Sequence, residues 1–478
     1  EGEVMQIEMS TYLKQAKPYL KSLLNQLLEV YTYVSILGTD ASGKSYRISR
    51  AGTNIGNGMF DERGFVVKVY NGKTYSEYAF NEIDATKVDE IVAQITQLVK
   101  LPECVADTVG YSAYAQLKEE SCTFSKSKEV RQHPKALGDE KIVQILTALH
   151  EKGKSQDTRI VDFRGDFEYL ETSKCFLSKH KDLEQSFMWS TGALMCVVAE
   201  GDKNNYHYKG FSGACGSELI EEMGEFVEEV AQVACELLQS EKMIPGTYDV
   251  ICAPDVAGLI AHEAFGHGVE MDMFVKDRAL AKDYIGEYVA SPLVTMHDGA
   301  VGEEDAGSYF FDDEGTLAQD VVIIEKGILK QGISDQLTAM KLGTRPTGNG
   351  RRESFERKAY SRMTNTYFKP GTSTLGDMIA SIEEGYLIDA SASGMEDPKN
   401  WGIQCMVSIA REIRNGRLTG KIYSPVVLTG YVPDLLKSIS MVSSDLVLTG
   451  TGACGKGYKE WVKVSTGGPY IKARVRLG

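Results

Sequence analysis

The sequence lacks any long hydrophobic run. None of its apolar stretches reaches the ~18 residues that a membrane-spanning helix requires, so no membrane span is expected. The N-terminus also lacks the basic region followed by an apolar one that marks a secretory signal, which favours a cytoplasmic location. Because the chain begins with Glu1 rather than Met, a trimmed leader stays open as an alternative.

The sequence also lacks an excess of basic residues. Its 52 Lys and Arg stand against 67 Asp and Glu, and the formal net charge of −15 argues against a nucleic-acid partner, since phosphate contacts require the opposite balance. The nine cysteines form no CxxC pair and no regular disulfide framework, and Cys196 and Cys235 lie in apolar surroundings. We therefore expect reduced, mostly buried thiols and a reducing compartment.

What is present is an ordinary globular composition, 42% hydrophobic and 25% charged over 478 residues, enough for two or three domains. Both halves mix helical patterns with antiparallel strand patterns, which indicates an α+β protein. Short strands and glycine-rich turns dominate after Tyr284 and favour a barrel-like assembly. Pro245-Gly246 indicates a break between the two halves. We expect an N-terminal α+β domain over 1–242, built of antiparallel sheet with helices, and a mostly-β metal-binding catalytic domain over 243–478.

Several local elements follow from periodicity. Alternating residues around the turn at Asn71-Gly72 predict a β-hairpin. Apolar residues at helical spacing predict helices over 85–101 and 217–238, the second capped by Ser217. A buried strand over 248–253 is expected to lead through Pro254-Asp255 into a further helix.

That further helix carries the most informative motif, His262-Glu263-Ala264-Phe265-Gly266-His267. Imidazole is a preferred zinc ligand, and a neighbouring Glu can act as a base toward an activated water. Residues five apart on a regular helix point ~140° away from each other at ~100° per residue. A one-residue bulge or a helix end would bring the two rings together, and Gly266 and Gly268 make that distortion cheap.

A catalytic zinc site needs a third protein ligand. His207 and His297 are lone histidines better explained by structural roles, and Glu270 and Asp272 fit either supporting or solvated positions. Cys454 differs, because it lies in the glycine-dense segment Thr-Gly-Ala-Cys-Gly-Lys-Gly at 451–457, which has no apolar periodicity and in which Lys456 can favour its thiolate. From the residues alone, Cys454 is a candidate metal ligand or nucleophile.

Four further motifs follow the histidine motif along the chain. The full set is HEAFGHGVEMD at 262–272, FDDEGT at 311–316, PTGNGRRES at 346–354, RMTNTY at 362–367 and CGK at 454–456. In this order the motifs resemble those of the TldD proteins, metal-bearing members of the TldD/TldE (PmbA) metalloprotease family formerly called modulators of DNA gyrase. The resemblance is dense over 245–478 and looser over about 60–240.

The resemblance implies a role for each matching residue. It implies that His262, His267 and Cys454 coordinate one Zn²⁺ per chain and that Glu263 is the catalytic base. It further implies unfolded or short peptides as substrates, and a dimer, either with a second copy or with a metal-less TldE/PmbA-type paralogue. Metal-assisted peptide hydrolysis is the reaction that these parts support.

Two other readings stay open at this stage. One is a cysteine hydrolase with Cys454 as the nucleophile and either motif histidine as the base. The other is a non-catalytic regulatory or binding protein. We also expect an extended peptide to pair with an edge strand. The candidates to line its cleft or to receive an oxyanion are Arg351, Arg352, Arg362 and Asn365.

Overall fold

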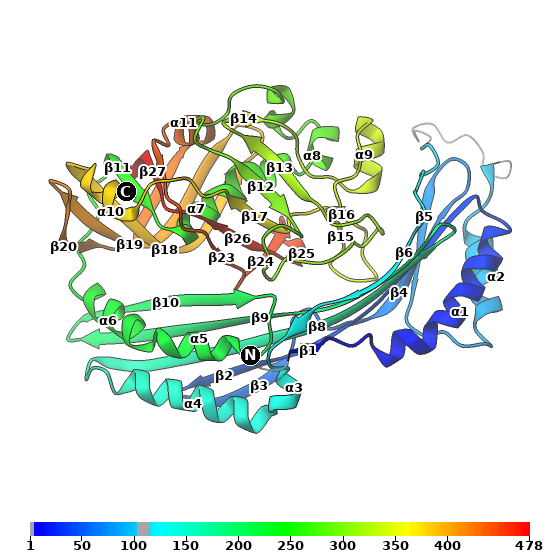
Figure 1. Ribbon diagram of the computed structural model, residues 1–478, viewed down its shortest axis with the longest axis horizontal. Helices are drawn as coiled ribbons and strands as arrows, with labels where there is room; N and C mark the ends of the chain where they lie inside the picture. The colour runs from blue at the N-terminus through cyan, green and yellow to red at the C-terminus, as the bar shows by residue number, and fades with distance from the viewer. Residues whose placement is uncertain (1–3, 103–113) are drawn as a thin grey trace.

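The structure is a computed structural model that describes residues 4–102 and 114–478, so Cys104 lies outside the described residues. Strands dominate it. Figure 1 shows long strands of the N-terminal half running beneath the C-terminal half and continuing to the right toward α1 and α2. The expected α+β fold with a barrel-like C-terminal part is confirmed, whereas the domain boundary at 242/243 stays a prediction.

The N-terminal half is built on an eight-stranded sheet of order β10-β9-β8-β2-β4-β5, antiparallel throughout this path. In addition β3 pairs with β2, and β6 lies parallel to β9. The strands are β2 Tyr33–Ser49, β3 Gly52–Asn57, β4 Glu62–Tyr70, β5 Tyr75–Phe80, β6 Cys122–Ser127, β8 Ile160–Ser178, β9 Lys181–Glu200 and β10 Lys203–Gly213. A small separate sheet joins β1, Met5–Gln6, to β7, Glu129–Val130.

Helices cover this sheet at both ends (Figure 1). Their apolar faces bury against the strands, as Ile142 and Leu146 of α4 do in the core that also holds Phe163 of β8. At the other end Leu20 and Leu23 of α1 pack in a separate core with β2 and β4. The helices are α1 Thr11–Leu28, α2 Val88–Leu98, α3 Pro134–Leu137, α4 Asp139–Lys154, α5 Leu219–Glu225 and α6 Val227–Leu237.

The C-terminal half contains a closed five-stranded barrel. Its strands follow the order β11-β18-β19-β21-β27, and β27 pairs back with β11. Alternate residues of β11 serve two cores, since Val250 faces the main core while Ile251 packs with Met378 of α10. The elements are β11 Gly246–Cys252, β18 Glu384–Asp397, β19 Gly402–Arg414, β20 Arg417–Tyr423, β21 Val426–Tyr431, β22 Met441–Val442, β27 Ile471–Leu477, α10 Leu375–Ala380 and α11 Val432–Lys437.

A six-stranded sheet of order β14-β13-β12-β17-β26-β23 flanks the barrel. Helix α7, Pro254–Ala261, lies between the two. It approaches β26 so closely that a Cβ on Gly258 would lie 2.6 Å from the backbone nitrogen of Gly467. The remaining elements are α8 Asp272–Val275, α9 Gln336–Leu342, β12 Met296–Gly299, β13 Asp320–Glu325, β14 Ile328–Leu329, β15 Gly350–Arg351, β16 Tyr360–Ser361, β17 Asn365–Phe368, β23 Val447–Thr449, β24 Ala453–Lys456, β25 Lys459–Lys463 and β26 Ser465–Gly468.

The segment 311–316 joins the two halves. Glu314 forms a buried ion pair with Lys68 of β4 at 2.5 Å, and Asp313 pairs with Lys174 of β8 at 2.5 Å. Phe311 packs with Phe176 in a small apolar core between the halves. The FDDEGT motif is therefore a contact between the N-terminal sheet and the C-terminal half.

Most of the local predictions are confirmed. The hairpin β4–β5 and the strand–helix unit β11–α7 form as expected. The single helix expected over 217–238 is wrong, because the chain breaks at Phe226, at φ −105° and ψ 1°, into α5 and α6. Within the described ranges, no helix combines the length and apolarity needed to cross a membrane.

Candidate metal centre

The two motif histidines lie where α7 changes its hydrogen-bond pattern. Residues His262–Gly266 form a π-turn in which the N–H of His267 donates to the carbonyl of His262, and a 3₁₀ turn, His267–Val269, follows. This i→i+5 bond brings the imidazoles together, with ring centroids 4.9 Å apart. Of the two distortions that the sequence allowed, a one-residue bulge or a helix end, the bulge forms and places the two histidines on the same side despite their five-residue spacing.

Two glycines make this turn possible. A Cβ on Gly266 would lie 2.2 Å from Sδ of the fully buried Met363, so a larger residue does not fit there without displacement. A Cβ on Gly394 of β18 would lie 2.8 Å from Cγ of Glu263. Glu263 therefore packs against a bare strand, and its Oε1 lies 4.0 Å from Nε2 of His262.

Cys454 reaches the histidines from the hairpin β24–β25, where it pairs with Val462. Its Sγ lies 3.3 Å from Nε2 of His267. One donor atom from each of His262, His267 and Cys454 lies within 4.8 Å of the others. Only 5% of Cys454 is exposed, whereas the other three residues of β24 are partly exposed.

A buried network of charges surrounds these three residues. Glu270, 1% exposed, faces Nδ1 of His267 at 2.8 Å and accepts from Nε of Arg362 at 2.9 Å. Arg362 also donates from Nη2 to Sγ of Cys454 at 3.0 Å. Lys456 lies 3.3 Å from Glu270 and 3.2 Å from Asp272. Glu270 and Asp272 are thus supporting anchors and not solvated carboxylates.

The network sets the charges at the centre. Burial alone would raise the pKa of Cys454, but the His262 and His267 imidazoles lower it well below its usual value. Burial would lower the pKa of His267, yet Cys454 and Glu270 raise it well above its usual value. Burial opposes ionisation of Glu270 as well, and Lys456 and Arg362 lower its pKa. The histidines, rather than the expected Lys456, therefore favour the thiolate.

These residues fit a divalent metal of borderline softness. Two imidazoles and a thiolate are a donor set that zinc accepts, with a fourth position left for substrate or water. Nδ1 of His262 is buried and has no hydrogen-bond partner among the described residues, as a nitrogen reserved for a metal would be. Glu270 orients His267 in the way that outer carboxylates orient metal-bound histidines.

The four residues expected in a substrate cleft divide into two pairs. Arg362 and Asn365 are fully buried: Arg362 supports Cys454, and Asn365 braces the loop 303–308 through Glu303 and Ser308. Arg351 and Arg352 instead line a cavity between the two halves of the molecule. Their contact with a substrate stays a prediction.

Glu396 of β18 is a residue that the sequence did not single out. Both its carboxylate oxygens are buried without a hydrogen-bond partner among the described residues. Oε1 lies 3.0 Å from where a Cβ on Gly268 would be, and burial raises the pKa of Glu396 well above its usual value. Its strand pattern is ordinary, so no signal in the sequence could have placed it beside the motif.

The chain is similar to known proteins over much of its length. Residues 245–476 match the family described as PmbA/TldA metallopeptidase C-terminal domain. A metalloprotease of Methanothermobacter thermautotrophicus is 30% identical over 64% of this chain and 67% of its own length. A metalloprotease TldD homolog of Buchnera aphidicola is 36% identical over 51% of the chain and 50% of its own length, so the chain spans about half of that relative. A zinc metalloprotease TldD homolog of Saccharolobus solfataricus is 25% identical over 86% of the chain and 89% of its own length.

Solved structures share the whole fold. A putative modulator of DNA gyrase from Thermotoga maritima covers 97% of this chain and all of its own length, with a TM-score of 0.76 and 18% identity. TldE from Thermococcus kodakarensis covers 96% of this chain and all of its own length, with a TM-score of 0.72 and 18% identity. On the sequence matches and the motif order together, this chain belongs to the TldD/PmbA family of metallopeptidases.

Proposed function

We propose that the protein is a zinc-dependent peptidase that hydrolyses unfolded or short peptides. His262, His267 and Cys454 are the proposed ligands of one Zn²⁺ per chain, and Glu263 is the proposed general base. The observation that carries this proposal is the convergence of three donor atoms within 4.8 Å of one another, beside the Glu263 carboxylate. A zinc ion bound there would polarise a peptide carbonyl and make an attacking water more acidic.

The chain's own residues then have distinct tasks. Glu263 takes a proton from the attacking water at its carboxylate and delivers it to the leaving amine. Its position against Gly394 fixes the side chain, because the bare strand lets the carboxylate approach His262. Glu270 fixes the ring of His267, and Arg362 holds the Cys454 thiolate.

An extended peptide has a place to bind beside these residues. Among the described strands, β24 and β25 pair only with each other, so the outer edges of the hairpin that carries Cys454 have no strand partner. Main-chain pairing at such an edge holds a peptide with weak side-chain preference. This supports unfolded or short peptides as the substrate class.

We further propose a dimer, either of two copies or of this chain with a metal-less TldE/PmbA-type paralogue. The shared fold with TldE of Thermococcus kodakarensis supports this pairing, because two chains of one fold can form a pseudo-symmetric interface.

Metal content is the measurement that tests the proposal. Elemental mass spectrometry of the purified protein should find about one zinc per chain, and Cys454→Ser or His262→Ala should lose it together with peptide hydrolysis. Glu263→Gln should keep the zinc and lose at least ~10²-fold in rate. A Glu263→Gln protein that cleaves peptides at the normal rate would remove the general-base assignment.

A cysteine hydrolase is the second candidate, because Sγ of Cys454 lies 3.3 Å from Nε2 of His267 and its pKa is lowered. Chelators and thiol-alkylating reagents separate the two mechanisms. The zinc peptidase is inactivated by both, whereas the cysteine hydrolase survives chelation. Activity in metal-free protein would therefore identify Cys454 as the nucleophile.

A further inference from the structure

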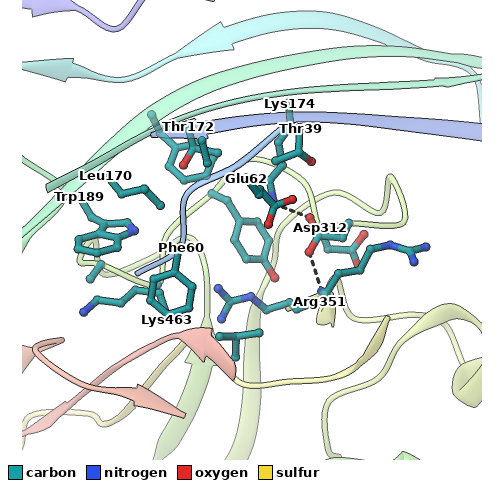
Figure 2. A pocket seen from close by; sticks show the side chains of 18 of the residues that line it. Thr39, Phe60, Glu62, Leu170, Thr172, Lys174, Trp189, Asp312, Arg351 and Lys463 are labelled. Carbon is teal, nitrogen blue, oxygen red and sulfur yellow. Dashed lines mark hydrogen bonds and ion pairs between the residues drawn. The ribbon is translucent and has the colours of Figure 1, made fainter. Parts of the chain in front are cut away.

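A cavity lies between the N-terminal sheet and the C-terminal half. Its volume is about 80 Å³. At roughly 10–15 Å³ for each water molecule, it has room for a carboxylate and a few adjoining carbon atoms. Figure 2 shows Phe60, Trp189 and Lys463 toward one end of it and Asp312 and Arg351 toward the other.

Two cations face this cavity without an ion pair. Lys463 is only 7% exposed, and its Nζ lies 4.4 Å from the centre of the Trp189 ring. Arg351 donates from Nη1 to the carbonyl of Met363 at 2.6 Å. Over residues 4–102 and 114–478, no carboxylate oxygen lies within 4.0 Å of the charged nitrogens of either side chain. Carboxylates act on both cations only from farther away, Glu168 and Asp305 on Lys463 and Asp313 and Asp298 on Arg351. Burial lowers the pKa of Lys463 to about 8, so its amine still carries charge near neutral pH, and an anion in the cavity would stabilise it.

The other charged groups of the cavity wall do not fill that role. Asp313 is already paired with Lys174 at 2.5 Å. Burial raises the pKa of Glu62 to about 7, and burial with the nearby Glu314 raises that of Asp312 to about 8, so both carboxyl groups carry reduced negative charge near neutral pH. Glu353 pairs with Arg357 at 3.7 Å and Arg352 pairs with Glu77, so Lys463 and Arg351 are the cations of the described cavity wall that have no carboxylate within 4.0 Å.

The cavity and the metal centre share one hairpin. Val462 of β25 lines the cavity and pairs with Cys454 of β24. Paired residues of antiparallel strands lie ~4.5–5.5 Å apart between Cα atoms, and one extended residue spans ~3.3 Å. A peptide bound beside Cys454 thus reaches the cavity within a few residues.

We propose that this cavity binds a carboxylate of the peptide substrate at its Lys463 end, with Arg351 adding positive charge from the other end. The rings of Phe60 and Trp189 then pack against the carbon atoms that carry the carboxylate. This inference rests on the proposed peptidase function, and it adds a preference that main-chain pairing alone does not provide. The carboxylate is either the C-terminus of the peptide or an acidic side chain.

Equilibrium binding of matched peptides tests the proposal. The fluorescence of the protein, which has Trp189 and Trp461 in the cavity wall, reports binding to the Glu263→Gln variant, so that cleavage does not interfere. We expect a peptide with a free C-terminus to bind ~10-fold or more tightly than its C-terminal amide, the usual effect of a hydrogen bond to a charged group. The same amidated peptide is then tested with one internal Glu. If the Glu restores the affinity, the cavity accepts an acidic side chain, and if it does not, the cavity requires the C-terminal carboxylate.

Variants of Lys463 complete the test. Lys463→Met should remove the preference for the carboxylate, and Lys463→Arg should keep it. The matched control is Lys459→Met, which changes an exposed lysine of the same strand and should bind as the parent does. If circular dichroism shows that Lys463→Met does not fold, Arg351→Gln takes its place. Equal affinities of the parent for the free acid, the amide and the Glu-containing amide would overturn the carboxylate site, as would a preference that survives both substitutions. Neither result bears on the proposed peptidase function, which is tested separately by zinc content and peptide cleavage.

Discussion

Nη2 of Arg362 lies 3.0 Å from Sγ of Cys454, and the Arg362 side chain has no exposed surface. The same guanidinium donates from Nε to Oε2 of Glu270, whose other oxygen faces His267 at 2.8 Å. One buried ion pair therefore supports two of the three proposed ligands, which come from segments 187 residues apart in the sequence.

Replacement of Arg362 should therefore damage both stability and metal binding. Arg362→Gln takes from the buried Glu270 one of its two charged partners, Lys456 being the other. Loss of a hydrogen bond to a charged group typically lowers the free energy of unfolding by ~1.5–3 kcal/mol. Loss of an outer partner of a ligand also costs ~10–100-fold in metal affinity. Urea unfolding and competition titration with a zinc chelator measure the two effects. Arg47→Gln is the control, because its pair with Asp166 is 54% exposed on the Arg side and should contribute under ~1 kcal/mol.

The π-turn should not tolerate a side chain at Gly266. The Cβ of Gly266→Ala would lie 2.2 Å from Sδ of Met363 and has to displace a fully buried neighbour. We expect a loss of ~1–3 kcal/mol in the free energy of unfolding, together with weaker zinc binding as the two imidazoles separate. Gly402→Ala is the control, since nothing lies within 4 Å of its Cβ position. Normal zinc affinity in Gly266→Ala would show that the turn accommodates a methyl group.

The Glu396 carboxyl group should destabilise the metal-free protein relative to a variant with an apolar side chain at this position. Both of its carboxylate oxygens are buried without a partner among the described residues, and such a group typically costs ~1–3 kcal/mol. Glu396→Leu should therefore raise the thermal unfolding temperature of the chelated protein, and Glu396→Gln should raise it less. A lower unfolding temperature for Glu396→Leu would mean that the carboxylate has a stabilising partner.

The sequence predicts well what is local. His262, Glu263 and His267 stand in one six-residue motif, and Gly266 already indicates the distortion that joins the two rings. The hairpin β4–β5 follows from alternation around a turn. These features depend on neighbours in the chain, so periodicity and turn chemistry reveal them.

What the sequence leaves open is decided by tertiary contacts. Spacing alone leaves Cys454 as either ligand or nucleophile, and only the family resemblance, and then the structure, places it beside His267. Glu270 and Arg362 are 92 residues apart, so the sequence around either residue does not predict their ion pair. Lys456 was expected to act on the thiolate, yet Glu270 and Asp272 hold its ammonium. The tertiary fold determines which buried charges lie close enough to pair, and local sequence patterns do not predict this proximity.

His207 should give the protein a pH-dependent stability that is separate from the metal centre. It lies on β10, 9% exposed, and burial lowers its pKa from 6.5 to about 4. Between these two values the unfolded chain binds the proton more readily, so the free energy of unfolding falls as the pH drops from about 6.5 toward 4. At 1.36 kcal/mol for each pKa unit, the total loss is on the order of 3 kcal/mol. Urea unfolding at pH 4.5 and 7.5 should show a smaller difference for His207→Gln than for the wild type. The control for loss of an imidazole is His180→Gln, because His180 is exposed. If the free energy of unfolding of His207→Gln changes between pH 4.5 and 7.5 as much as that of the wild type, other groups cause the acid sensitivity.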